Sequence, residues 1–159
     1  VAMRKRVISD VQQAGASPPG DWLNLEDLAE VEISSEDAAH PIESALVPGG
    51  GSGWRAAVPG KQTIRLLFAQ PQTLRRIWLS FVETSVQRTQ EYVLRCSADG
   101  GQSFRDIVRQ QWNFSPDGAN SQSEDHRVEL AAVNILELII TPDIGNQAAF
   151  ASLAQLRIA

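Results

Sequence analysis

The sequence predicts an all-β fold, an antiparallel jelly-roll β-sandwich with an amino-terminal arm. Beyond residue 61, successive runs alternate apolar and polar side chains with a period of two, as half-buried strands do. Turn-forming residues such as Gln70-Pro71, Asp99-Gly100-Gly101 and Pro142-Asp143 separate these runs. Seven or eight short strands with this spacing are typical of a sandwich or barrel. The 159 residues suit one such domain with a sizeable core.

The part of the chain before residue 62 has less periodicity. Residues 1–30 are assigned to the arm, in which the stretch DWLNLEDLAE favours one short helical turn. Val7, Ile8 and Val11 are the apolar residues expected to anchor the arm. The sandwich itself is assigned to residues 31–159: a strand at 31–33, a helical turn at 41–46 and a flexible PGGGSG loop at 48–53 open it.

The period-two pattern assigns one face of each later strand to the core. The expected core residues are Ile64, Leu66, Phe68, Ile77, Leu79, Phe81, Tyr92, Leu94, Leu138, Ile140 and Leu156. Runs 64–68 and 77–81 are interpreted as two strands, because Gln70-Pro71 lies between them.

Composition and charge argue against several classes of function. The net charge is −5, and residues 7–53 contain no Lys or Arg but nine acids. Because nucleic-acid binding needs a concentrated basic surface, this distribution makes a nucleic-acid partner unlikely. No apolar run approaches the roughly 18 residues of a membrane span, so no membrane partner is expected. Cys96 is the only cysteine, which excludes an internal disulfide and makes a cytoplasmic location the default expectation.

The segment Tyr92–Phe104, with the octapeptide SADGGQSF, resembles the central hairpin of discoidin domains, also called coagulation-factor C-type domains. Further landmarks follow the family's order: Ser34-Ser35-Glu36, the WRAA stretch at 54–57, QTIRL at 62–66 and ASLAQLRI at 151–158. The resemblance covers about residues 31–159 and implies a galactose-binding-like sandwich. Fold alone does not give the ligand, because this architecture carries many.

Two further points concern what the resemblance implies. Residues 34–67 also resemble the amino-terminal domain of a DNA single-strand-break repair scaffold, which has the same galactose-binding-like sandwich. Many discoidin domains hold calcium in an Asp-Gly-rich loop before the tryptophan. Here that loop, Pro48–Gly53, contains no acid, so no cofactor or metal is expected and the discoidin calcium site lacks its acids.

The segment Gln110–Gln122 carries the candidate ligand site. It combines the aromatic rings of Trp112 and Phe114 with the polar groups of Asn113, Asp117 and Asn120. A flat ring stacks on a pyranose while amides and carboxylates bind its hydroxyls, so this mixture favours sugar recognition. The alternative is that Trp112 and Phe114 are core residues at a strand end. Arg88 is expected to be exposed at the same end of the sandwich.

The remaining candidates have simpler interpretations. Trp54 is expected in the core, because the resemblance to discoidin domains implies a tryptophan packed beneath a loop at this position. His40, near Glu36, Asp37 and Glu43, could ligate a metal or be a surface histidine among solvating charges. No nucleophile elbow or phosphate loop is present, so an enzyme is not expected. The predicted function is a non-catalytic module that binds a carbohydrate or sugar-like ligand through its loop end. The alternative is a protein–protein adaptor, and a nucleic-acid module is less favoured.

Overall fold

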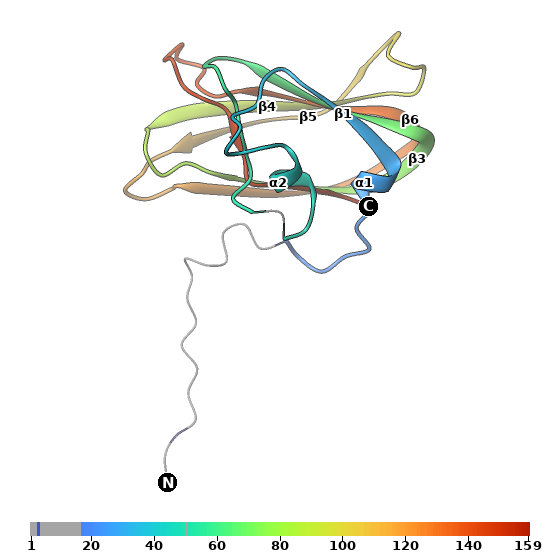
Figure 1. Cartoon of the computed structure of the whole chain (residues 1–159), viewed down its shortest axis with the longest axis horizontal. Coiled ribbons are helices and arrows are strands. Elements are labelled where there is room, and N and C mark those ends of the chain that lie inside the picture. Colours follow the sequence, from blue (N-terminus) through green and yellow to red (C-terminus); the bar gives the residue numbers. More distant parts are fainter. Residues whose placement is uncertain (1–2, 4–16, 50) are drawn as a thin grey trace.

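Two layers of antiparallel strands pack face to face in the computed structural model, which describes residues 3, 17–49 and 51–159 (Figure 1). One layer has the strand order β1-β3-β6-β4-β5, and the other is formed by β8, β3 and β6. A short pair, β2 with β7, lies outside these layers. The strands are β1 (Ala29–Ile33), β2 (Trp54–Arg55), β3 (Gln62–Val82), β4 (Arg88–Ser97), β5 (Arg105–Phe114), β6 (Ser121–Thr141), β7 (Ser152–Leu153) and β8 (Gln155–Ile158). The predicted all-β antiparallel sandwich is confirmed.

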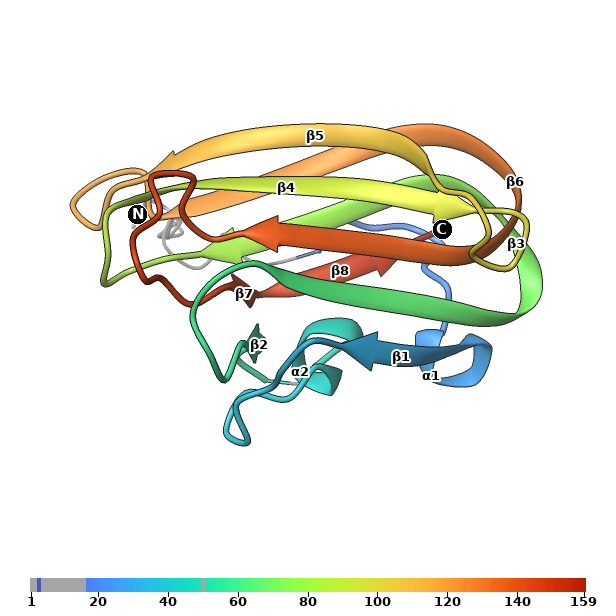
Figure 2. The same ribbon diagram turned by 90° about the horizontal axis from the view of Figure 1, so that it is seen from above.

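The long strands β3 and β6 belong to both layers. The first part of β3 pairs with β1 up to Phe68 and with the end of β6 up to Leu67. The second part, from Arg76, pairs with β8 and with the start of β6. Between them the β3–β6 register shifts three times, and the bend carries both strands from one layer to the other (Figure 2).

The expected break at Gln70-Pro71 is therefore wrong, because β3 continues through it. Pro71 is exposed and has no partner in the β3–β6 register. A proline costs a strand little where its missing N–H would not have joined the ladder. The two predicted strands, 64–68 and 77–81, are the two ends of one bent strand.

Every predicted core residue is buried between the layers. Phe81 from one layer stacks on Tyr92 from the other, with ring centroids 5.2 Å apart. The hydroxyl of Tyr92 lies 2.7 Å from Nε2 of His126 on β6. Burial raises the pKa of the Tyr92 hydroxyl and lowers the pKa of the His126 imidazole, so both groups are neutral at pH 7.

Short helical turns and the β2–β7 pair close one side of the sandwich. The predicted turns are present as α1 (Leu25–Leu28) and α2 (Glu43–Leu46). Trp54 is buried as expected, and its indole donates to the carbonyl of Ser35 at 3.1 Å. The preceding Gly53 has φ +96°, and a Cβ there would lie 2.6 Å from the Leu153 carbonyl oxygen. This junction requires glycine.

The described part of the arm is attached to the sandwich. The Leu23 amide donates to the Ile158 carbonyl at 2.8 Å, and Leu25 is buried in the core. The guanidinium of Arg76 lies 4.5 Å from the centroid of the Trp22 ring. The predicted anchors Val7, Ile8 and Val11 lie outside the described residues. No helix in the described ranges has the length and apolar character needed to cross a membrane.

Candidate functional site

Two neighbouring hollows mark one end of the sandwich, where the β3–β4, β5–β6 and β6–β7 connections lie (left in Figure 2). The larger, of about 600 Å³, is lined by Gln87, Arg88, Thr89, Asn113, Phe114, Asp143 and Gln147. The smaller, of about 380 Å³, is lined by Gln111, Trp112, Asn113 and Ala119. Asn113 lines both. The structure thus brings together three of the five predicted site residues, Arg88, Trp112 and Asn113.

Arg88 is buried, and the expectation that it would be exposed is wrong. Its Nε donates to Glu83 at 2.7 Å, and its Nη1 donates to the Pro142 carbonyl at 2.8 Å. Its guanidinium also lies 4.8 Å from the centroid of the Phe114 ring. Arg88 therefore joins the β3–β4 connection, β5 and the segment after β6. Its burial makes it a support for the hollow's wall.

Glu83 is the counter-charge that permits this burial. Burial alone would raise the pKa of Glu83, but hydrogen bonds from Arg88 and from the Ser85 amide outweigh that effect, and the pKa is lowered. The Nη2 atom of Arg88 is buried and has no hydrogen-bond partner among the described residues. One donor of the guanidinium thus stays unsatisfied beside the larger hollow.

Asp143 organises the part of the larger hollow next to Arg88. Its carboxylate accepts the amides of Gly145, Thr89 and Gln147 at 3.1 to 3.3 Å. These amide hydrogen bonds, above all that from Gly145, lower the pKa of Asp143, and the nearby Arg88 adds to the effect. In the sequence, Pro142-Asp143 indicates only the end of a strand, and this role of Asp143 was not predicted. The Asp-x-Gly spacing, typical of an Asx turn, was the available signal.

Trp112 and Asn113 lie at the end of β5 and not in a long loop as expected. Trp112 is half-buried and packs against the core, and its indole N–H is buried with no acceptor among the described residues. Asn113 points to the other face and is exposed, and its Oδ1 accepts the Thr89 hydroxyl at 2.7 Å. Phe114 is fully buried, so the core interpretation holds for this ring.

The other two predicted site residues, Asp117 and Asn120, lie in the turn between β5 and β6 and line neither hollow. Asp117 is exposed. The carbonyl of Asn120 accepts the amide of Glu83 at 2.8 Å, which ties the β5–β6 turn to the β3–β4 connection. The main chain of Asn120 thus joins the β3–β4 and β5–β6 connections at this end of the sandwich.

The described ranges contain no group of three or more His, Cys, Asp or Glu side chains placed to hold a metal ion. Nδ1 of His40 lies 3.2 Å from the Asp37 carboxylate, and both side chains are about two-fifths exposed. An exposed pair of this kind matches the second interpretation of His40, a surface histidine among solvating charges.

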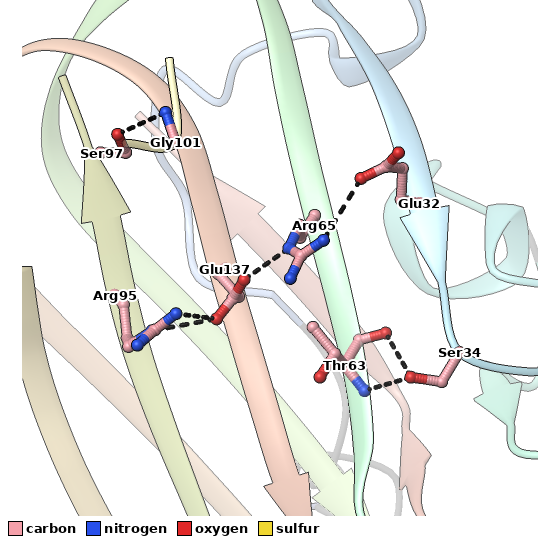
Figure 3. A network of polar contacts seen from close by, with 8 residues as sticks. All are labelled: Glu32, Ser34, Thr63, Arg65, Arg95, Ser97, Gly101 and Glu137. Atoms are coloured by element: carbon pink, nitrogen blue, oxygen red, sulfur yellow. Dashed lines mark hydrogen bonds and ion pairs between the residues drawn. The ribbon is translucent and has the colours of Figure 1, made fainter. Parts of the chain in front are cut away.

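A cross-strand row of charges crosses the outer face of the five-stranded layer (Figure 3). The buried carboxylate of Glu137 accepts from Arg65 on one side and from Arg95 on the other. Arg65 also lies 3.6 Å from Glu32 on β1. Because each charge has an opposite neighbour, this row serves to hold four strands in register.

Comparison with known proteins identifies the fold. No protein-family model matches the sequence, and no curated protein matches it. Solved structures do match. A family 32 carbohydrate-binding module from Clostridium perfringens, in complex with GalNAc-β-1,3-galactose, has 18% identity and a TM-score of 0.63, covering 87% of this chain and 99% of that one. The family 32 module of C. perfringens NanJ, in complex with galactose, has 17% identity and a TM-score of 0.61, covering 86% and 96%.

A match to an enzyme chain is also found. A GH29 fucosidase from Ruminococcus gnavus, in complex with fucose, has 9% identity and a TM-score of 0.64, covering 86% of this chain but 26% of that one. At such identities the comparisons establish the fold alone. The β-sandwich fold implied by the discoidin resemblance is confirmed.

Proposed function

We propose that this protein is a non-catalytic module that binds a carbohydrate at the end of the sandwich formed by Arg88, Thr89, Trp112, Asn113 and Asp143. One observation carries the proposal: a hollow of about 600 Å³ is lined by amide, hydroxyl and carboxylate groups, beside a second hollow with an indole at its wall. Sugar hydroxyls need such paired donors and acceptors. Solved modules of the same fold hold sugars, and this supports the choice of ligand.

The residues divide into contacting and supporting groups. Thr89, Asn113 and the exposed Gln87 and Gln147 offer neutral hydrogen-bonding groups at the surface of the larger hollow. Trp112 is half-buried, and the exposed part of its ring lines the smaller hollow. Arg88 and Asp143 are largely committed to the protein's own groups and fix the walls. A ligand would meet a site whose loops are already held in place.

Direct titration tests the proposal. Galactose-, N-acetylgalactosamine- and uronate-terminated oligosaccharides should be screened on a glycan array, and the best binder then titrated calorimetrically. Asn113→Ala and Trp112→Ala should each weaken binding by roughly 1 to 3 kcal/mol, the cost of removing a hydrogen-bond partner or a stacking face. The exposed Gln102→Ala, in the β4–β5 turn at the opposite end, is the matched control and should bind like the parent.

Measurements of thermal stability distinguish a loss of binding from a loss of folding in these variants. Asn113→Ala should leave the thermal midpoint nearly unchanged because the side chain is exposed. Absence of binding to every glycan on the array, or equal affinity in all three variants, would contradict the proposal.

Charge weighs against a nucleic-acid ligand at this site. Arg88 is neutralised by Glu83, and Asp143 adds a carboxylate to the larger hollow. A nucleic-acid site would need several unpaired basic groups and an affinity that falls steeply with salt. Titration with a neutral, galactose- or N-acetylgalactosamine-terminated sugar should therefore be insensitive to salt between low and physiological ionic strength.

A further inference from the structure

Among the described residues, strand β1 leaves one edge of the five-stranded layer without a partner strand, on a side of the molecule distinct from the proposed sugar site. Within these residues β1 pairs with β3 alone and stands at the margin of its layer, beside α1 and α2 (Figure 2). The Ser34 amide donates to the Thr63 carbonyl, so in this antiparallel ladder the residues that bond β3 are Glu30, Glu32 and Ser34. The main-chain groups of Val31 and Ile33 therefore point away from β3, toward the free edge.

An apolar groove lies beside this edge. Its volume is about 360 Å³, and its wall includes the inward side chains of Val31 and Ile33 from β1 together with Ile42 and Leu46 beside them. Val31 and Ile33 are only half-buried, although their side chains point to the core face of the layer. A strand placed next to β1 would cover them and would continue the layer by one strand.

The surroundings of the groove are acidic. Glu26, Glu36 and Glu43 line it, and Glu30 and Glu32 point outward from β1. No Lys or Arg occurs between residues 7 and 53, which include α1, β1 and α2. Of these acids, Glu36 is committed to the Ile42 amide at 2.6 Å and Glu32 has Arg65 as a neighbour, whereas Glu30 and Glu43 are exposed.

We propose that the β1 edge and its groove bind an extended segment of a partner protein in which basic and β-branched residues alternate. Main-chain hydrogen bonds to Val31 and Ile33 would supply affinity, as in other cases of strand addition. The period of two in a strand would place the branched side chains in the groove and the basic side chains beside Glu30 and Glu32. Charge complementarity selects this occupant.

A second copy of this chain fits the edge less well. Antiparallel pairing of β1 with its own equivalent would bring Glu30 and Glu32 of each copy against those of the other, and like charges on facing strands are destabilising. The same glutamates that attract a basic segment thus protect the edge from self-association.

A labelled probe peptide, Lys-Val-Arg-Val-Lys-Val-Arg, tests the proposal by fluorescence anisotropy with the full chain. We expect saturable binding that Val31→Pro weakens at least tenfold, because proline removes the outward amide of Val31 but no bond to β3. Val31→Thr keeps that amide and should bind within twofold of the parent. Methylating alternate amides of the peptide should abolish binding in one register and preserve it in the other, which tests strand addition without altering the protein.

Charge variants provide an independent measurement. Glu30→Lys with Glu43→Lys should weaken probe binding at least tenfold, whereas Asp117→Lys with Glu129→Lys, which changes the net charge equally elsewhere, should have an effect under threefold. The sugar-site variant Asn113→Ala should bind the probe like the parent, so failure of one proposal does not imply failure of the other.

Four outcomes would overturn the proposal. The first is that the probe shows no saturable binding, and the second is that the Val31→Pro variant binds the probe as tightly as the parent. The third is that the parent forms a concentration-dependent dimer that Val31→Pro abolishes. The fourth is that the probe binds only after Arg4, Lys5 and Arg6 are replaced by Ala. The third would assign the edge to a second copy, and the fourth to the chain's own basic segment.

Discussion

Arg88 and Arg109 show how differently two arginines on neighbouring strands contribute to stability. Arg88 is buried and paired with Glu83, which is itself largely buried, whereas the side chain of Arg109 is 59% exposed and pairs with Glu91. Removing one member of a buried pair leaves an uncompensated charge and costs about 3 to 5 kcal/mol, while exposed pairs contribute about 1 kcal/mol or less. Arg88→Ala should therefore lower the free energy of unfolding in urea by about 3 to 5 kcal/mol. Arg109→Ala should lower it by less than about 1 kcal/mol, and equal losses would contradict this account.

Glu137 gives a second residue-scale prediction. Its side chain is 2% exposed, but the side chains of its partners Arg65 and Arg95 are 43% and 31% exposed and can turn to water. Glu137→Ala should therefore destabilise the protein by about 2 kcal/mol, below the range for a fully buried pair. Chemical denaturation measures this loss. Glu129→Ala, an exposed position on the same strand, should change stability by no more than about 0.5 kcal/mol.

The sequence predicted burial correctly for residues whose burial follows from the alternation of side chains along a strand. It failed for a residue whose burial depends on a specific partner. Tyr92, Leu94 and the other alternating apolar residues are buried as expected. Arg88 also falls on the inward phase of β4, although it was expected to be exposed. Its burial depends on Glu83, Phe114 and the Pro142 carbonyl, and the last two are remote in sequence.

At the scale of elements, the β4–β5 hairpin is stabilised by a side chain within its own turn. The Asp99 carboxylate accepts the Ser103 amide and hydroxyl and the Ser97 hydroxyl. These bonds, led by the Ser103 hydroxyl, lower the pKa of Asp99 to about 2 from an ordinary value of 3.8. A lowered pKa means that the stabilisation is complete above the ordinary value and is lost as the pH falls through about 2.

Asp99→Asn tests that pH dependence. The variant should have a lower thermal midpoint than the parent at pH 7, and the difference should shrink between about pH 4 and pH 2 as the parent's carboxylate becomes protonated. Asp106→Asn, an exposed neighbour in β5, is the control and should follow the parent. A difference that stays constant down to pH 2 would show that the charge of Asp99 is not what stabilises the turn.

The elements themselves were predictable to different degrees. The hairpin turn, the two helical turns and the strand at 31–33 follow from local signals that the structure confirms. The continuity of β3 through Pro71 could not be predicted locally, because a proline's cost depends on whether its position faces a ladder partner. Likewise, Trp112 and Asn113 join β5 because Gln90 and Thr89 on β4 lie opposite them.

At the scale of the whole molecule, the two proposed surfaces use different physical features of one fold. The sugar site lies at the ends of β4 and β5 and on the adjoining loops held by Arg88 and Asp143. The β1 site uses acidic side chains and a strand edge that has no partner among the described residues. A module built this way could bind glycan and protein at once, since the two sites share no residue. The expected cytoplasmic location remains a prediction.

The arm gives the last prediction, because it tests where the folding unit begins. Residues 1–30 were assigned outside the sandwich, yet Leu25 packs in the core, the Leu23 amide bonds the last strand, and β1 begins at Ala29. Up to residue 20, the described contacts are few: the Pro18 carbonyl accepts from Trp22, and the Pro19 carbonyl accepts from Arg76.

Deleting residues 3–20 should therefore leave a domain that unfolds cooperatively, with a thermal midpoint close to that of the full chain. Deleting residues 3–30 should cost at least the roughly 2 to 5 kcal/mol of a lost core leucine, together with two residues of β1. Calorimetry and urea unfolding of both truncations decide the boundary. If the shorter deletion already abolishes cooperative unfolding, residues 3–20 belong to the folding unit. If the longer one is as stable as the full chain, the boundary at residue 31 is correct and Leu25 contributes nothing essential to the core.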